Sequence, residues 1–161
     1  MGILRKWGIA AAAAALAVAL ALPASAQSGR AGIGFIIGEP TGISGKLFIT
    51  ENTAFDAGAA WSLVKDSNFH LHADYLRHNF SILKREFGIT EGELPLYFGV
   101  GGRIRFDDDD SRVGVRLVAG VSYIFDNAPL DVFFEVSPIM DLAPKTELDF
   151  NAGAGLRFWF E

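Results

Sequence analysis

The stretch Leu148 to Phe160, LDFNAGAGLRFWF, places an apolar side chain at every second position and mostly polar or small residues between them. Successive side chains of a β-strand point to opposite faces of the sheet, so a period of two predicts a strand. The two faces of this strand must meet different surroundings. Hydrocarbon on one side and a polar interior on the other fit the pattern, as in a β-barrel that spans a membrane.

The first residues have the features of a secretory signal peptide. Arg5 and Lys6 precede an alanine-rich apolar run, which ends in the small-x-small pattern ASA at residues 24–26. The apolar run is short and leads directly into the cleavage pattern, which disfavours a retained membrane helix. We therefore expect residues 1–26 to be removed after export through the general secretory pathway, and residues 27–161 to form one domain.

The composition supports a single apolar-walled domain. The chain has no cysteine, which excludes disulfides and a lipid anchor on cysteine. Without Arg5 and Lys6, 12 basic side chains face 19 acidic ones, a net charge of −7, so nucleic acid is not an expected partner. Half of the chain is hydrophobic, with 14 phenylalanines and 18 glycines, which is typical of a barrel whose outer wall contacts lipid.

Eight stretches of the chain alternate apolar and polar side chains, and short turn-like segments separate them. They span residues 30–37, 43–49, 53–61, 69–75, 94–106, 112–125, 130–137 and 148–160. Eight such strands use nearly all of the mature chain. We predict an all-β fold, an eight-stranded antiparallel up-and-down transmembrane β-barrel.

The ends of the fourth and seventh strands are less distinct. Either the fourth strand extends through Ile82 and shortens the connection over residues 80–93, or these residues form a small periplasmic excursion; we expect the first, because Phe80 and Ile82 continue the alternation. In the seventh strand, Pro138 lacks the amide N–H that a sheet ladder needs. We expect strand pairing to weaken there.

The content of the two faces predicts which one is inside. The polar face carries nearly balanced charges, contributed by Lys46, Arg103, Arg105, Arg112, Arg116 and Arg157 and by Asp56, Asp74, Asp131, Glu135 and Asp149. Such balance suits a closed interior, where charges must pair. The opposite face carries almost no charge, as hydrocarbon requires. Aromatic residues near strand ends are candidates for interfacial girdles, namely Trp61, Tyr75, Phe106, Tyr123, Phe125, Phe158 and Phe160.

Residues 155–160, GLRFWF, resemble the C-terminal assembly signal of outer-membrane barrels, with Gly155 followed by Phe158 and Phe160 at alternate positions. Glu161 extends the pattern by one residue. Other segments are similar to a widespread family of small, functionally uncharacterised bacterial outer-membrane β-barrel proteins: GEPTGISGK (38–46), DYLRHNF (74–80), LPLYFGVGGRIRF (94–106), GVRLVAGVSYIF (114–125) and APLDVFFEVSPIMDL (128–142). The resemblance implies an outer-membrane location and contact with the barrel-assembly machinery during insertion. It implies no reaction.

Candidate chemistry is sparse. His70, His72 and Asp74 share one strand face, so they are candidate metal ligands or an acid–base pair, but a tetrahedral site would need a further ligand from a neighbouring strand. We expect the histidines to belong to the interior polar network instead. The acidic run at residues 107–110 lacks the spaced ligands and the glycine of a calcium loop, so we interpret it as a solvated turn. We predict no metal, no cofactor and no catalytic residue.

These features favour a monomeric, non-enzymatic barrel in contact with outer-membrane lipid, with a structural or surface-interaction role. An eight-stranded barrel is just wide enough for side chains to fill, so a general porin is not expected. Two alternatives remain. One is a lipid-modifying enzyme with a serine and a histidine at the membrane boundary, and the other is a soluble periplasmic binder of the lipocalin type, with the apolar face turned inward.

Overall fold

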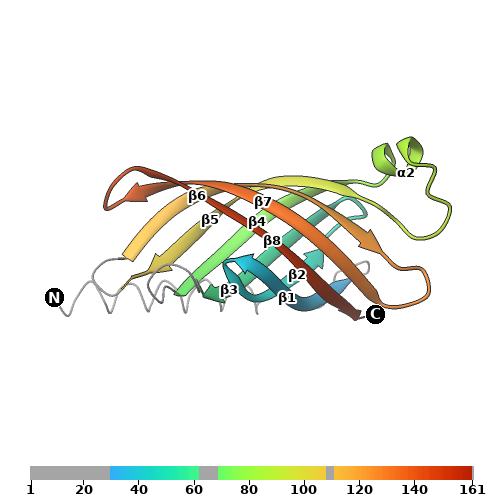
Figure 1. Ribbon diagram of the computed structural model, residues 1–161, viewed down its shortest axis with the longest axis horizontal. Coiled ribbons are helices and arrows are strands. Elements are labelled where there is room, and N and C mark those ends of the chain that lie inside the picture. The colour runs from blue at the N-terminus through green and yellow to red at the C-terminus, as the bar shows by residue number, and fades with distance from the viewer. Residues whose placement is uncertain (1–29, 62–68, 108–110, 161) are drawn as a thin grey trace.

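The computed structural model describes residues 30–61, 69–107 and 111–160. They form a closed antiparallel barrel in which each strand pairs with its neighbours in chain order (Figure 1). The strands are β1 (Ala31–Glu39), β2 (Thr41–Phe48), β3 (Thr53–Trp61), β4 (Phe69–Asn79), β5 (Leu96–Phe106), β6 (Ser111–Ile124), β7 (Leu130–Ala143) and β8 (Glu147–Phe160). The predicted eight-stranded up-and-down barrel is confirmed. The expected signal peptide, residues 1–26, lies outside the described residues, as do residues 108–110 of the acidic run.

Pairing of the first strand with the last one closes the barrel. Ala31 on β1 lies opposite Phe160 on β8, so the barrel begins and ends at the same rim, which we call the terminal end. The opposite rim, the far end, carries the last residues of β5 and the β7–β8 turn, while the β1–β2 turn points the same way but stops short of that rim (Figure 1). Within the described residues, no helix is long and apolar enough to cross a bilayer.

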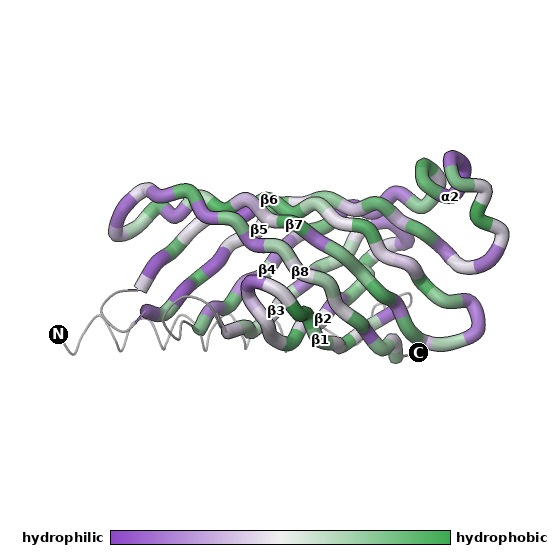
Figure 2. The backbone as a smooth tube through the Cα atoms, in the orientation of Figure 1, coloured by the Kyte–Doolittle hydropathy of each residue, from purple (hydrophilic) through white to green (hydrophobic). Residues whose placement is uncertain are grey.

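Apolar and polar residues alternate along the strands, as the banded tube in Figure 2 shows. Four apolar side chains on different strands test the orientation: Phe98, Val115, Val132 and Phe150 are 58%, 40%, 40% and 58% exposed. They point away from the barrel axis, while the charged residues between them are buried. The apolar-inward arrangement that the soluble alternative requires is therefore wrong.

The fourth strand ends earlier than we expected. β4 stops at Asn79, whose side-chain oxygen accepts hydrogen bonds from the backbone N–H groups of Ser81 at 3.1 Å and Ile82 at 3.0 Å. This local turn replaces the ladder and starts a short helix, α2 (Ile82–Glu86). The prediction that β4 extends through Ile82 is wrong, and residues 80–95 form a long connection at the terminal end.

The seventh strand continues past Pro138 as far as Ala143. On one side Pro138 keeps its register opposite Phe150 of β8. On the other side the β6 ladder has a gap between the pairs Ala119–Val136 and Arg116–Ile139. Because proline has no N–H to donate, pairing is lost only toward β6, which confirms the predicted weakening without ending the strand.

Aromatic side chains gather at both rims. At the far end, the ring of Phe69 lies 5.6 Å from that of Trp61 and 6.1 Å from that of Phe106. At the terminal end, the rings of Phe158 and Phe160 are 5.2 Å apart. Two aromatic rims separated by an apolar wall are typical of a barrel that spans a bilayer.

Candidate functional site

The barrel interior holds all the charged and histidine residues that we singled out from the sequence. Ten of them are buried: Lys46, Asp56, His70, His72, Asp74, Arg103, Arg116, Asp131, Glu135 and Arg157. Three lie half-buried at the far end: Arg105, Arg112 and Asp149. The arrangement falls into groups, each centred on an arginine.

Arg157 on β8 is the centre of the first group and is fully buried. Its guanidinium lies 3.3 Å from the carboxylate of Asp56 on β3 and 3.3 Å from that of Asp131 on β7. It also donates to the hydroxyl of Ser44 on β2 at 3.0 Å. One side chain thus ties together strands on both sides of β8.

Lys46 extends this first group. Its ammonium nitrogen lies 3.9 Å from Asp56 and 4.1 Å from the centre of the Tyr97 ring. The Tyr97 hydroxyl in turn donates to Glu135 at 3.1 Å. A cation over an aromatic face and a carboxylate on the phenol stabilise groups that would otherwise be costly to bury.

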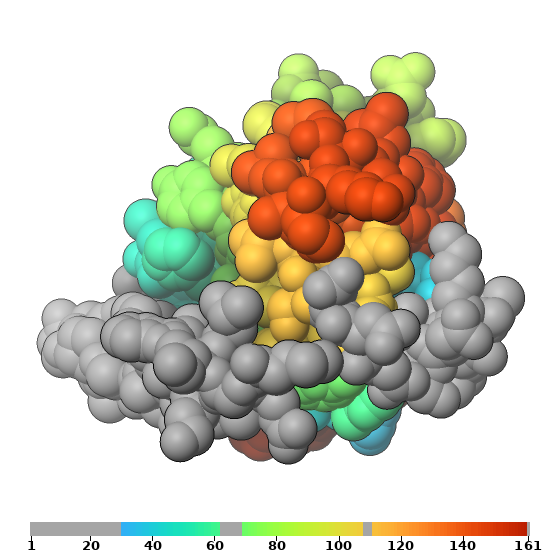
Figure 3. Space-filling model, turned by 90° about the vertical axis from the view of Figure 1, so that its left-hand side faces the viewer, coloured from blue at the N-terminus to red at the C-terminus, as the bar shows by residue number. Residues whose placement is uncertain are grey.

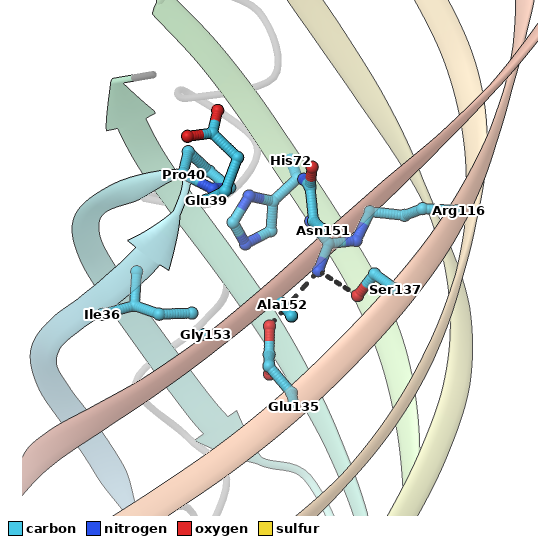
Figure 4. A pocket seen from close by; sticks show the side chains of 10 residues that line it. All are labelled: Ile36, Glu39, Pro40, His72, Arg116, Glu135, Ser137, Asn151, Ala152 and Gly153. Atoms are coloured by element: carbon cyan, nitrogen blue, oxygen red, sulfur yellow. Dashed lines mark hydrogen bonds and ion pairs between the residues drawn. The ribbon is translucent and has the colours of Figure 1, made fainter. Parts of the chain in front are cut away.

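Arg116 on β6 is the centre of the second group, in the middle of the barrel. Its Nε lies 3.1 Å from Asp74 on β4, and its Nη2 donates to Glu135 at 3.3 Å and to Ser137 at 3.0 Å (Figure 4). Since Glu135 also accepts from Tyr97, the first two groups form one connected network.

A third group lies at the far end. Arg103 donates to Asp141 at 2.8 Å and to Asp149 at 2.9 Å, and Arg112 donates to Glu147 at 2.6 Å. Sequence reasoning missed Asp141 and Glu147, because the seventh and eighth strands are longer than we predicted. Asp141 is in phase with Asp131 and Glu135, and this spacing could have revealed it.

The structure brings together only two of the candidate metal ligands named from the sequence, since His70 is not part of the potential ligand set and its ring centre lies 6.1 Å from that of His72. The remaining histidine, His78, packs against Phe48 at 4.7 Å and Tyr97 at 5.1 Å.

His72 and Asp74 come together with Asp56, which lies on the neighbouring strand β3. Potential ligand atoms of Asp56, His72 and Asp74 lie within 4.8 Å of one another. However, these two carboxylates already contact Lys46, Arg157 and Arg116, whose positive charges would repel a metal ion. The surroundings favour ion pairing over metal binding.

Little free space remains beside the second group. A cavity of about 10 Å³ lies between the β1–β2 turn and β8, and His72, Arg116 and Asn151 line it together with Ile36 and Glu39 (Figure 4). This volume accommodates about one water molecule. At the terminal end, Phe48 packs against Trp159 with ring centres 5.5 Å apart, and Ala54 and Phe80 complete this apolar cluster.

Comparison with the solved structures finds similar chains. The N-terminal β-barrel domain of Pseudomonas aeruginosa OprF superposes with a TM-score of 0.59 at 15% sequence identity, over 83% of this chain and 100% of that one. The chain has the fold of that barrel domain. Neisserial surface protein A gives a TM-score of 0.48 at 14% identity, over 82% of this chain and 96% of that one. Comparison with protein-family profiles finds no match, and comparison with the curated proteins finds none either.

Proposed function

We propose that this chain is a monomeric integral protein of the bacterial outer membrane, whose side-chain-filled interior makes it a structural or surface-contact barrel and not a diffusion pore. The apolar outer wall, the aromatic rims and the signal-like first 26 residues support the location. The OprF barrel domain supports it through the shared fold.

The observation that carries the proposal is the burial of the interior arginines. Arg103, Arg116 and Arg157 are each 2% exposed or less, and each is bound to carboxylates on other strands. An arginine that lines a water-filled channel would keep part of its guanidinium in solvent. Ion pairs that cross the interior therefore support a closed barrel.

Conductance in planar bilayers tests this proposal. Protein refolded in detergent is first shown to insert, by an SDS gel band that shifts on boiling and by resistance to protease in vesicles. We expect no stable channels from protein that passes both controls. Steady single-channel currents would contradict a closed interior, and release of the native protein from cell envelopes by sonication without detergent would contradict the membrane location.

We assign no catalytic step to this barrel. Ser44 and Ser137 accept hydrogen bonds from Arg157 and Arg116, which leaves them tied into the ion-pair network. Mass spectrometry of lipid A incubated with the purified protein tests the enzymatic alternative. An unchanged mass is expected, whereas a change that His70→Ala or His72→Ala abolishes would favour a lipid-modifying enzyme.

A further inference from the structure

The connection between β4 and β5, residues 80–95, is an ordered element of the terminal end. Asn79 caps its first turn, as described above, and α2 then continues with backbone bonds from Arg85 to Ser81 and from Phe87 to Leu83. Gly88 adopts a positive φ of 61°, and the Ile89 N–H donates to the Lys84 carbonyl, which ends the helix. The sequence thus specifies this turn of helix at both of its ends.

The second half of the connection is fastened to the barrel. Glu93 pairs with Ile124 at the end of β6 through backbone bonds of 3.0 and 2.8 Å, and the Tyr123 hydroxyl donates to the carbonyl of Glu91. With Asn79 at one end and Glu93 at the other both fixed, α2 keeps a defined place beside the barrel mouth. In Figure 1 it stands to the side of the strands and not over the barrel opening.

The helix is unusual in what it exposes. None of its residues is buried. Ile82 is 50% exposed, and Phe87, directly after the helix, is 69% exposed. These fractions are comparable to the 58% of Phe98, which faces outward on the barrel wall. Lys84 and Arg85 are exposed beside them. A single helical turn is marginal in water, so an apolar surface that covers Ile82 and Phe87 would stabilise it.

We infer that α2 and Phe87 rest on an anionic phospholipid surface at the terminal end, with Ile82 and Phe87 at the boundary between headgroups and acyl chains and with Lys84 and Arg85 beside lipid phosphates. The inference rests on the proposed function, because it requires the barrel wall to lie in a bilayer.

Two observations favour lipid over another occupant. The exposed Ile82 and Phe87 lie at the terminal end of the barrel, the same end at which β5 starts with the outward-facing Leu96 and Phe98. The helix also carries the adjacent exposed cations Lys84 and Arg85, which outnumber its one acid, Glu86, and complement phosphate groups. In Figure 3, which looks along the barrel from the far end, yellow-green parts of the chain project beyond the outline of the barrel at the top.

Site-specific labelling tests the contact, because the chain has no cysteine of its own. The cysteine of the Phe87→Cys variant is labelled with an environment-sensitive fluorophore. The labelled protein is then refolded into vesicles whose lipids bear a nitroxide quencher near the headgroup. Phe98→Cys reports insertion of the barrel wall, and Lys145→Cys, exposed in the far-end β7–β8 turn, reports a water-exposed position. We expect strong quenching at positions 87 and 98 and weak quenching at position 145.

The outcomes separate the two proposals. Quenching at position 98 with position 87 as weakly quenched as position 145 would overturn the lipid contact of α2 and leave the membrane barrel intact. Absence of quenching at position 98 would overturn the proposed function itself.

A charge series tests the choice of anionic lipid. We expect Lys84→Gln and Arg85→Gln to lower the ratio of quenched to unquenched label at position 87 by roughly fivefold for each charge removed, in vesicles that contain anionic phospholipid. Lys145→Gln is the matched control and should leave the ratio unchanged. Equal quenching in anionic and zwitterionic vesicles, with no effect of either substitution, would overturn the role of the two cations.

Discussion

Arg157 on β8 and Asp56 on β3 form an ion pair of 3.3 Å although β1 and β2 lie between their strands around the barrel. Gly32 on β1 makes this reach possible, because a Cβ atom there would lie 2.8 Å from Cδ of Arg157. The glycine leaves room for the arginine to lie across the inner face of β1. The alternating glycines of this chain and its buried arginines therefore fill the interior together.

Arg157→Met tests the contribution of this pair to stability. The substitution keeps most of the side-chain volume but leaves Asp56 and Asp131 buried without their shared cation, so we expect a loss of about 3–5 kcal/mol in the free energy of unfolding. Urea unfolding of the protein in lipid vesicles, followed by tryptophan fluorescence, measures it.

Arg112→Met is the matched control at the far-end rim. The Arg112 side chain is 31% exposed, so water can solvate its carboxylate partners after the substitution, and we expect a loss of about 1 kcal/mol or less. If Arg157→Met and Arg112→Met lost the same free energy of unfolding, burial would not determine how much an ion pair contributes to stability.

Gly101 and Gly102 offer a second comparison, between neighbours in the chain. A Cβ atom at Gly101 would collide with the backbone oxygen of Ala73 and the carboxylate of Asp74, whereas one at Gly102 would meet nothing nearer than 3.8 Å. We expect Gly101→Ala to cost about 1–3 kcal/mol and Gly102→Ala to be nearly neutral, measured by the same urea unfolding. A neutral Gly101→Ala would mean that the interior at Asp74 is less tightly packed than the structure describes.

The period of two in the sequence was enough to predict the fold and to assign residues to the two faces. Asp131 and Glu135 could be placed inside because each lies two or four residues from another polar position on a strand whose other face is apolar. The strand ends were harder to predict. The side chain of Asn79 ends β4 by accepting hydrogen bonds from the backbone N–H groups that follow it. Such a side-chain bond competes with strand pairing, and the alternation of apolar and polar residues gives no sign of it.

Partners within the interior depend on closure of the barrel and could not be read from the sequence. Asp56 and Asp74 are opposite one another because β3 and β4 pair in that register, and Arg116 reaches Asp74 across β5, where Gly101 leaves room. The same register brings Nε2 of His72 to 3.8 Å from the carboxylate of Asp56. A one-residue slip would have turned these side chains to the outer face.

Leu117→Arg tests the lipid-facing wall. Leu117 is 56% exposed near the middle of β6, so an arginine there would sit close to the bilayer midplane and cost about 2–4 kcal/mol. Phe125→Arg, at the terminal rim just after β6, should cost only about 0–1 kcal/mol. Unfolding from vesicles gives both values. If the two positions tolerated arginine equally, the outer wall of β6 would not cross hydrocarbon.

Phe160→Ala tests the predicted assembly signal separately from stability. Phe160 and Phe134 are both outward-facing and 51% exposed, so their replacement by alanine should remove a similar contact with lipid and lower the stability of the refolded barrel by a similar amount. In cells we expect a difference, because only Phe160 belongs to the terminal pattern that resembles the assembly signal. The amount of protein with a heat-modifiable gel band in the outer membrane should fall for Phe160→Ala and stay close to that of the unaltered protein for Phe134→Ala. Equal amounts of folded Phe160→Ala and Phe134→Ala protein would show that the terminal aromatic residue acts only through its contact with the bilayer.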